Sequence, residues 1–476
     1  MEAIFFELSA IILLSTALAL IAKIFKQPIL LAFIVAGIIL GPLGLNWIRS
    51  HELIDVLASF GIALLLYVVG IELDVKKFRE LNTATLLAGF GQIIFTGIIG
   101  FAIAYILQFS ITEAWFISIT LTLSSTILVI KLLGEQRQLE SLYGRIAVSI
   151  LLVQDFLAII ALLLLESFSA NSVTTIPWMD LGWMAGKTIL LVAIAFILTK
   201  FVFRKIFIFV GHSPELLFLW SIGWCLLFAS LALWLHFPLA IGVFIAGLAI
   251  ASLDYNYEIA ARIRSLRDFF IVIFFTYLGS QLLLTIEPRL WWTTLILSLY
   301  VLIGNPLIVY IILVLAGQQK RTAFFTGLAI GQVSEFSFII ANRGLAKGFI
   351  SQDLVSTIAL VGLITMIIST YLITYNAAVY RQLKPLLDAL PLPQRQQPTN
   401  QLPKLLKNHV LIFGYHTTVN TVIEELKTQH NDIVVVDYNP ANSAAIKHQS
   451  VHYIYGDMRN EDILKLAQLE QAQMII

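Results

Sequence analysis

The chain has 476 residues, of which 59% are hydrophobic and 12% charged, with a mean hydropathy of +0.89. Soluble globular chains carry about a quarter charged residues, so this composition excludes an ordinary soluble protein and indicates a membrane protein. The formal net charge of +1 argues against a nucleic-acid partner, because binding many phosphates needs a basic excess. The single cysteine, Cys225, excludes a disulfide framework and a metal–thiolate site.

Thirteen apolar windows are long enough to cross a membrane, for which a helix needs about 20 residues. The first window is expected to remain as a helix, because it lacks the basic start and the small-residue cleavage site of a signal peptide. The boundary near Pro238 is open, because this proline could kink one long helix or begin a new one. The windows are 3–22, 28–46, 53–72, 84–107, 114–132, 144–168, 181–209, 214–235, 237–253, 268–285, 291–316, 322–342 and 354–378.

Lysine and arginine divide unequally between alternate loops. One set of loops holds eighteen of them, and the other holds five, which are Arg49, Lys187, Arg289, Arg343 and Lys347. By the positive-inside rule this bias predicts an N-terminus outside and a C-terminal end in the cytoplasm. We expect a multi-pass protein of a bacterial-type inner membrane, in contact with membrane lipid.

Two polar runs interrupt the apolar windows, TLTLSST (120–126) in the fifth and GQVSEFS (331–337) in the twelfth. Such runs can satisfy an interrupted backbone. The two windows are seven apart, and we expect spans two to seven and eight to thirteen to form inverted repeats. Paired breaks in two repeats point to a transport site at the membrane midplane.

Asp155 lies in the apolar run SILLVQDFLAII (149–160) of the sixth window. It is about ten residues from the cytoplasmic end, so at about 1.5 Å per residue it lies near the midplane. A carboxylate there is costly and predicts a functional site; the alternative is a neutral aspartate that only packs helices. Glu335 is a second midplane carboxylate. The predicted ion-binding residues are Ser124, Ser125, Thr126, Gln154, Asp155, Gln332, Ser334 and Glu335.

A carboxylate that holds either a proton or a monovalent cation couples the two by competition. Because Gln154 stands beside Asp155 in place of a second acid, we expect one cation to exchange for one proton without net charge movement. The cation is K⁺ or Na⁺, with K⁺ preferred and Na⁺ exchange by the same fold as the alternative. A gated cation channel is disfavoured, because the sequence has no carbonyl-filter motif such as TVGYG. The chain is expected to be a transporter and not an enzyme.

The composition changes after residue 380. Residues 381–407 form a linker rich in Pro and Gln, which separates a membrane domain, 1–380, from a cytoplasmic domain, 408–476. Strands alternate with helices in this last part, which predicts a parallel Rossmann-like sheet, incomplete because the chain stops where a fourth strand should begin. The three expected strands are 409–414, 433–437 and 451–455.

A Rossmann-like domain holds phosphates at the turn after its first strand, and an acid about 20 residues on holds the ribose. Asp437 is 23 residues past Gly414, but only this first glycine of GxGxxG is present, and His416 stands where a small residue is needed. No cofactor is expected to be required. A nucleotide of the AMP or NAD type is the candidate ligand, and a scaffold or dimerising role is the alternative. The candidate contacts are Gly414, His416, Asp437 and Asp457.

These features resemble the monovalent cation:proton antiporter family 2, and within it the Kef-type potassium/proton antiporters with an RCK/KTN-like domain. The resemblance rests on LSSTILVIKLL (123–133), VQDFLAII (153–160), GQVSEFSF (331–338) and the appended domain. It implies a homodimer in which a mobile core domain moves as an elevator, with the fifth and twelfth spans crossed and unwound. It also implies that Asp155 binds cation and proton.

Two departures from the family limit what the resemblance implies. In glutathione-gated members an acidic regulatory loop stands where residues 254–267 here contain three arginines against two acids. Glutathione control is therefore not expected. Electrogenic relatives carry a lysine in the tenth span, and residues 269–284 contain none, which agrees with electroneutral exchange.

Overall fold

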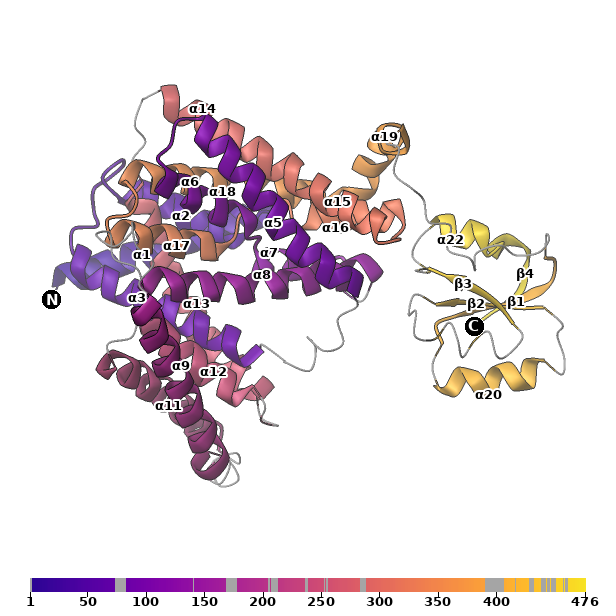
Figure 1. Ribbon diagram of the computed structural model, residues 1–476, viewed down its shortest axis with the longest axis horizontal. Coiled ribbons are helices and arrows are strands. Elements are labelled where there is room, and N and C mark those ends of the chain that lie inside the picture. Colours follow the sequence, from indigo (N-terminus) through magenta and orange to yellow (C-terminus); the bar gives the residue numbers. More distant parts are fainter. Residues whose placement is uncertain are drawn as a thin grey trace.

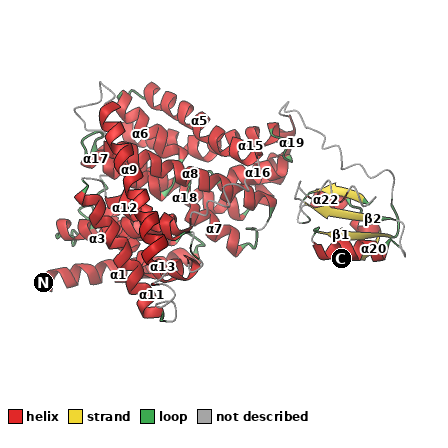
Figure 2. Cartoon of the chain, turned by 60° about the horizontal axis from the view of Figure 1, so that its bottom comes forward, coloured by secondary structure: helices red, strands yellow, loops and turns green. Residues whose placement is uncertain are grey.

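The computed structural model describes the chain as a helical part followed by a small sheet (Figures 1 and 2). The structure describes all residues except 1, 73–82, 140, 168–177, 204–205, 207–212, 236–238, 252, 254–255, 283–287, 390–405, 416, 428–431, 438–441, 443–445, 447–450, 457 and 459–460. The helices of the first part, with two π-helical segments (η), are α1 (Glu2–Ile24), α2 (Ile29–Leu40), α3 (His51–Glu72), α5 (Thr83–Ile106), α6 (Ile111–Thr122), α7 (Thr126–Glu135), α8 (Leu142–Ser167), α9 (Trp178–Leu198), η2 (Thr199–Phe203), α11 (Pro214–Trp234), α12 (Leu239–Ile250), α13 (Asn256–Ser280), α14 (Pro288–Leu299), η3 (Tyr300–Gly304), α15 (Asn305–Leu315), α16 (Lys320–Ala329), α17 (Glu335–Ala346), α18 (Gln352–Thr374) and α19 (Asn376–Ala389).

Eight candidate spans in the described part of the chain are long and apolar enough to cross a membrane. Shorter apolar helices, such as Ile29–Leu40 and Ile241–Ile250, coincide with further expected windows. A helical polytopic membrane fold is therefore confirmed. The number thirteen and the inverted repeats stay predictions, and the boundary at Pro238 lies outside the described residues.

Helix α13 begins at Asn256, well before the window predicted at 268–285. An i,i+4 ion pair between Glu258 and Arg262, with 3.2 Å between nitrogen and oxygen, supports the added turns. The arginines of this segment therefore lie on a helix and not in a loop. The π-helical segment η3 directly precedes Asn305 and Pro306, and π-bulges and prolines are sites where helices kink.

The fifth and twelfth windows are each divided into two half-helices. The fifth consists of α6 and α7, with residues 123–125 unwound between them. The twelfth consists of α16 and α17, with non-helical backbone at 330–334. Both interruptions fall on the polar runs that predicted them, because serine, threonine and glutamine side chains can bond the backbone groups that the breaks release.

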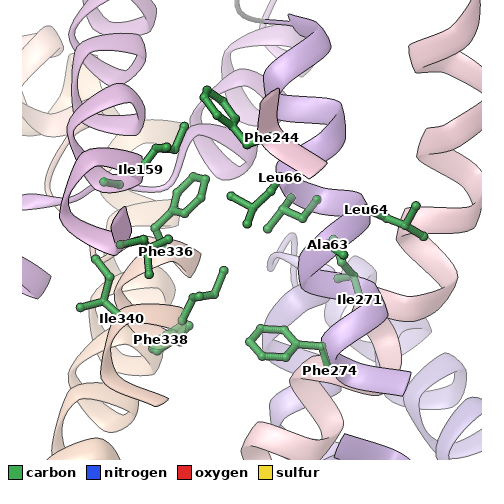
Figure 3. Packing of buried hydrophobic residues seen from close by; sticks show 14 of the residues in the cluster. Ala63, Leu64, Leu66, Ile159, Phe244, Ile271, Phe274, Phe336, Phe338 and Ile340 are labelled. Atoms are coloured by element: carbon green, nitrogen blue, oxygen red, sulfur yellow. The ribbon is translucent and has the colours of Figure 1, made fainter. Parts of the chain in front are cut away.

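The helical part contains two groups of mutually packed helices, one with α2, α3, α12 and α13 and one with α5–α8 and α15–α18. Glycines allow very close packing in the first group, because a Cβ added at Gly37 or Gly247 would collide with the main chain of the neighbouring helix. The faces where the two groups meet are apolar: Phe336 and Phe338 of α17 lie opposite Leu66 of α3 (Figure 3). No charged side chain belongs to this described cluster.

The C-terminal part is a parallel sheet in the order β3-β2-β1-β4. Its register pairs Val410 with Ile433 and Val434 with His452. The fourth strand begins close to where the sequence predicted one, and it pairs with β1. The elements are β1 (His409–Phe413), α20 (Thr417–Leu426), β2 (Ile433–Asp437), β3 (His452–Tyr455), α22 (Glu461–Leu466), the 3₁₀ turn η4 (Leu469–Gln471) and β4 (Ala472–Ile475).

Candidate functional site

The two unwound segments cross and bond each other directly. The main-chain N–H of Ser334 donates to the carbonyl oxygen of Leu123 at 3.0 Å. The hydroxyl of Ser124 donates to the carbonyl oxygen of Ile330 at 2.8 Å. Each break therefore satisfies main-chain groups of the other, in a region where all four residues are buried and water is scarce.

The last carbonyls of α6 receive side-chain donors from two further helices. Ser337 of α17 donates its hydroxyl to Thr120 O at 2.7 Å, and Asn305 of α15 donates Nδ2 to Leu121 O at 3.0 Å. Neither residue was predicted to belong to the site. Asn305 interrupts an apolar stretch, with LYVLIG before it and PLIVYII after it, and a buried amide there could have indicated a partner for exposed carbonyls.

Asp155 of α8 lies at the N-terminus of half-helix α7. Thr126, the first residue of α7, donates its hydroxyl to Asp155 Oδ2 at 2.9 Å, and the Asp155 residue is only 7% exposed. Ser125 caps the same helix by accepting a hydrogen bond from Leu128 N at 3.2 Å. The positive end of the α7 dipole therefore points towards a buried carboxylate, which favours its negative charge.

Glu335 is the first residue of the other half-helix, α17, and it is 2% exposed. Ser334 caps this helix, accepting from Phe336 N at 3.2 Å, and its hydroxyl also lies 3.4 Å from Glu335 Oε2. Gln332 points elsewhere: its oxygen accepts from the Ser369 hydroxyl of α18 at 2.6 Å, and its nitrogen donates to the main chain of α16. The crossing thus has one carboxylate near each half-helix N-terminus.

Gln154 is turned away from the oxygens around Asp155. Its Oε1 accepts from Ser124 N at 3.0 Å, and its Nε2 donates to Gln92 Oε1 at 2.7 Å. The structure thus brings Asp155 and Thr126 together, while Gln154 bonds the break itself. Gln92 of α5 was not predicted.

Exposure varies around Asp155, and its neighbour Phe156 on α8 is 42% exposed. One turn further along α8 towards the predicted outside, Ile159 is 5% exposed, and Phe336 beside it is 1% exposed (Figure 3). One turn along α7 towards the predicted cytoplasm, on the face that carries Thr126, Ile130 is 40% exposed. Among the described residues, no three His, Cys, Asp or Glu side chains gather as a metal site.

The family model "Sodium/hydrogen exchanger, transmembrane" matches residues 10–375, which is most of the chain. The chain belongs to the sodium/hydrogen exchanger family. A second model, "TrkA-N domain", matches residues 410–476 of the exchanger. This combination confirms the predicted relationship to Kef-type cation/proton antiporters with a C-terminal RCK domain.

Similar proteins agree with this family assignment. The chain is 25% identical to a protein of Escherichia coli (strain K12) named as a cation/proton antiporter, YbaL, over 98% of this chain and 85% of the relative. It is 26% identical to K(+) efflux antiporter 6 of Arabidopsis thaliana, over 70% of this chain and 57% of the relative. The solved structure of the sodium proton antiporter MjNhaP1 from Methanocaldococcus jannaschii shares the fold, with a TM-score of 0.59 and 18% identity over 82% of this chain and 99% of that one.

The residues described in the TrkA-N domain of the exchanger fit a nucleotide poorly. Gly414 has a φ of 84°, as a turn after β1 requires. Asp437, which would hold the ribose, is 6% exposed and accepts from Tyr415 N at 2.7 Å and from Asn442 Nδ2 at 3.1 Å. Its carboxylate thus ties β2 to the turn. The other two predicted contacts, His416 and Asp457, lie outside the described residues.

Proposed function

We propose that this exchanger moves one K⁺ against one proton, and that Asp155 binds the two alternately. The observation that carries the proposal is the buried Asp155 carboxylate, bonded to Thr126 at the point where the two breaks cross. A carboxylate with so little access to water is stable only when a proton, a cation or strong donors compensate its charge. Proton and cation therefore exclude each other at this group.

Oxygen atoms near Asp155 support binding of a hard monovalent cation. The carboxylate and the Thr126 hydroxyl are 2.9 Å apart, so one ion in contact with both would lose part of its water shell to protein oxygens. The Thr126 hydroxyl would then turn its lone pairs towards the ion.

Gln154 supports electroneutral exchange. Its side chain is neutral and is bonded on both sides, to Ser124 N and Gln92 Oε1. A second carboxylate at this position would face an acceptor where Gln154 Nε2 now donates, so the network itself requires an amide. Of the two adjacent positions 154 and 155, only Asp155 then carries a carboxylate that can exchange a proton.

The apolar contact between the two helix groups supports an elevator movement. Phe275 of α13 and Phe338 of α17 meet across it with ring centroids 6.1 Å apart. Such a contact is not directional, so it permits one group to slide along the other. The hydrogen bonds that join α18 to Gln281 O, at 2.8 Å, and to Phe25 O, at 3.3 Å, would break in such a movement.

Hydrogen bonds join segments that are predicted to lie on the same side of the membrane. Arg289, near the start of α14, donates to Leu107 O at 3.0 Å, and both are predicted at the outer ends of their helices. Tyr371 donates to Phe25 O at 3.3 Å, and both lie at the predicted cytoplasmic end. We expect a homodimer in a bacterial-type inner membrane, with the N-terminus outside.

Proteoliposomes with an internal pH dye and a preset proton gradient test the proposal. Adding K⁺ to wild-type vesicles should dissipate the gradient at the same rate with the membrane potential free or clamped. Na⁺, Li⁺ and Rb⁺ are compared in the same assay, and a preference for Na⁺ would establish the alternative.

Asp155→Asn should abolish cation-dependent proton movement while the purified protein remains folded. Asp268→Asn is the matched control, because Asp268 pairs with neighbouring Arg267 on α13 with its side chain 63% exposed. Exchange that survives in Asp155→Asn would show that another group carries the proton.

A further inference from the structure

Gln92 lies in the middle of α5 and is fully buried. Its Nε2 donates to Thr122 O at 3.1 Å and to the Thr96 hydroxyl at 3.2 Å. Its Oε1 accepts from Gln154 Nε2 at 2.7 Å, and Gln154 Oε1 accepts from Ser124 N at 3.0 Å. Two amide side chains thus form a continuous chain of hydrogen bonds, the amide relay, from Thr122 O to Ser124 N.

The relay joins the two main-chain groups that flank Leu123 in the unwound segment. Thr122 O is a carbonyl that the end of α6 leaves without its helical partner, and Ser124 N is an amide that the unwound segment leaves without one. Both are buried, and an unpaired buried main-chain group costs about 1–3 kcal/mol. The relay therefore satisfies the break through side chains of α5 and α8.

The two main-chain groups at the ends of the relay, Thr122 O and Ser124 N, fix the orientation of each amide side chain. Ser124 N–H can only donate, so the oxygen of Gln154 must face it, and the nitrogen of Gln154 must face Gln92. Gln92 then presents its oxygen to Gln154 and its nitrogen to Thr122 O, which can only accept. Neither amide can flip without placing two donors or two acceptors in contact.

We propose that Gln92 is a positioning residue for the exchange site, which acts through Gln154 and does not touch the cation. The relay holds Ser124, two residues before Thr126, against α8, the helix that carries Asp155. It thereby fixes the distance between the Thr126 hydroxyl and the Asp155 carboxylate. This inference rests on the proposed exchange at Asp155.

Loss of Gln92 should weaken cation binding more than it weakens the fold. In Gln92→Met the volume is kept, but Gln154 Nε2 loses its acceptor and the start of α7 becomes free to shift relative to Asp155. We expect the K⁺ concentration for half-maximal exchange to rise about tenfold, with a smaller change in maximal rate. Gln154→Met breaks the same relay and should give the same shift.

The matched control is Ser118→Ala. Ser118 of α6 donates to Gly97 O of α5 at 2.7 Å, so this variant removes a partly buried bond between the same two helices outside the relay. It should lower thermal stability as Gln92→Met does, while the half-maximal K⁺ concentration stays at the wild-type value.

The decisive measurement is the double variant Gln92→Met with Gln154→Met. If both residues act through one relay, the double variant should shift the half-maximal K⁺ concentration no more than either single variant. The inference would be overturned if the shifts of the two single variants multiplied in the double variant. It would also be overturned if the half-maximal K⁺ concentration were unchanged in Gln92→Met, or shifted equally in Ser118→Ala. An inactive wild type, or an active Asp155→Asn, would instead overturn the proposed function.

Discussion

Thr126→Val removes one hydroxyl and keeps the shape of the side chain, so it isolates the 2.9 Å hydrogen bond to Asp155. A hydrogen bond to a charged group contributes about 1.5–3 kcal/mol, which corresponds to a factor of about 10 to 150. The dipole of α7 still faces the carboxylate in the variant, so we expect the loss of free energy to lie near the lower end of this range. The half-maximal K⁺ concentration should therefore rise about tenfold.

Loss of this hydrogen bond should also shift the pH dependence of exchange. The direction of the shift follows from the role of the Thr126 hydroxyl as the donor. The Thr126 hydroxyl stabilises the ionised carboxylate, which is the form that binds the cation, so its removal favours the proton-bound form. Protons then compete successfully up to a higher pH, and half-maximal exchange should shift upwards by about one pH unit. The measurement is the initial rate of gradient dissipation in proteoliposomes across a pH series.

Two further variants control this experiment. Thr126→Ser keeps the hydroxyl and should retain most of the wild-type profile. Thr370→Val removes a fully buried hydroxyl that bonds its own helix, at 2.8 Å to Met366 O, and should not move the profile. A wild-type half-maximal K⁺ concentration and pH profile in Thr126→Val would refute the assignment of Thr126 to the site.

Two further predictions concern hydrogen bonds that stabilise the crossing of the unwound segments and the turn after β1. Asn305→Leu leaves Leu121 O without its donor and should lower the free energy of unfolding by about 1 kcal/mol, seen as an earlier thermal transition of the purified protein; an unchanged transition would mean that this bond is not needed. Asp437→Ala should speed hydrogen exchange at the Tyr415 amide of the full chain, whereas AMP or NAD should not slow it in the wild type; slowing by either nucleotide would show that the domain binds it.

The sequence located the breaks well but not the groups that complete them. A run such as 120–126 predicts an interrupted helix, because its hydroxyls can bond the backbone groups that a break releases. The acceptors that these hydroxyls find, such as Ile330 O and Thr120 O, are main-chain atoms that every residue possesses. No side-chain pattern could have identified them.

Gln92 shows a second limit of sequence reasoning. It stands alone in an apolar window of α5, and a single buried amide indicates a partner without indicating which one. In the C-terminal part, by contrast, strands β1 to β3 follow runs of β-branched and apolar residues, so their positions were predicted closely. The contact between Asp437 and the main chain of Tyr415 again depended on tertiary structure.

The two half-helices α7 and α17 both begin at the crossing, so two positive helix ends lie in the region that a cation must enter. Each end has its own carboxylate: Asp155 bonds the first residue of α7, and Glu335 is itself the first residue of α17. If Asp155 alternates between proton and cation, its charge is not always available to offset these ends. Glu335 is bonded to its own cap, and if it keeps one protonation state throughout the cycle it adds no proton to the exchange. The second midplane carboxylate is therefore compatible with a stoichiometry of one cation for one proton.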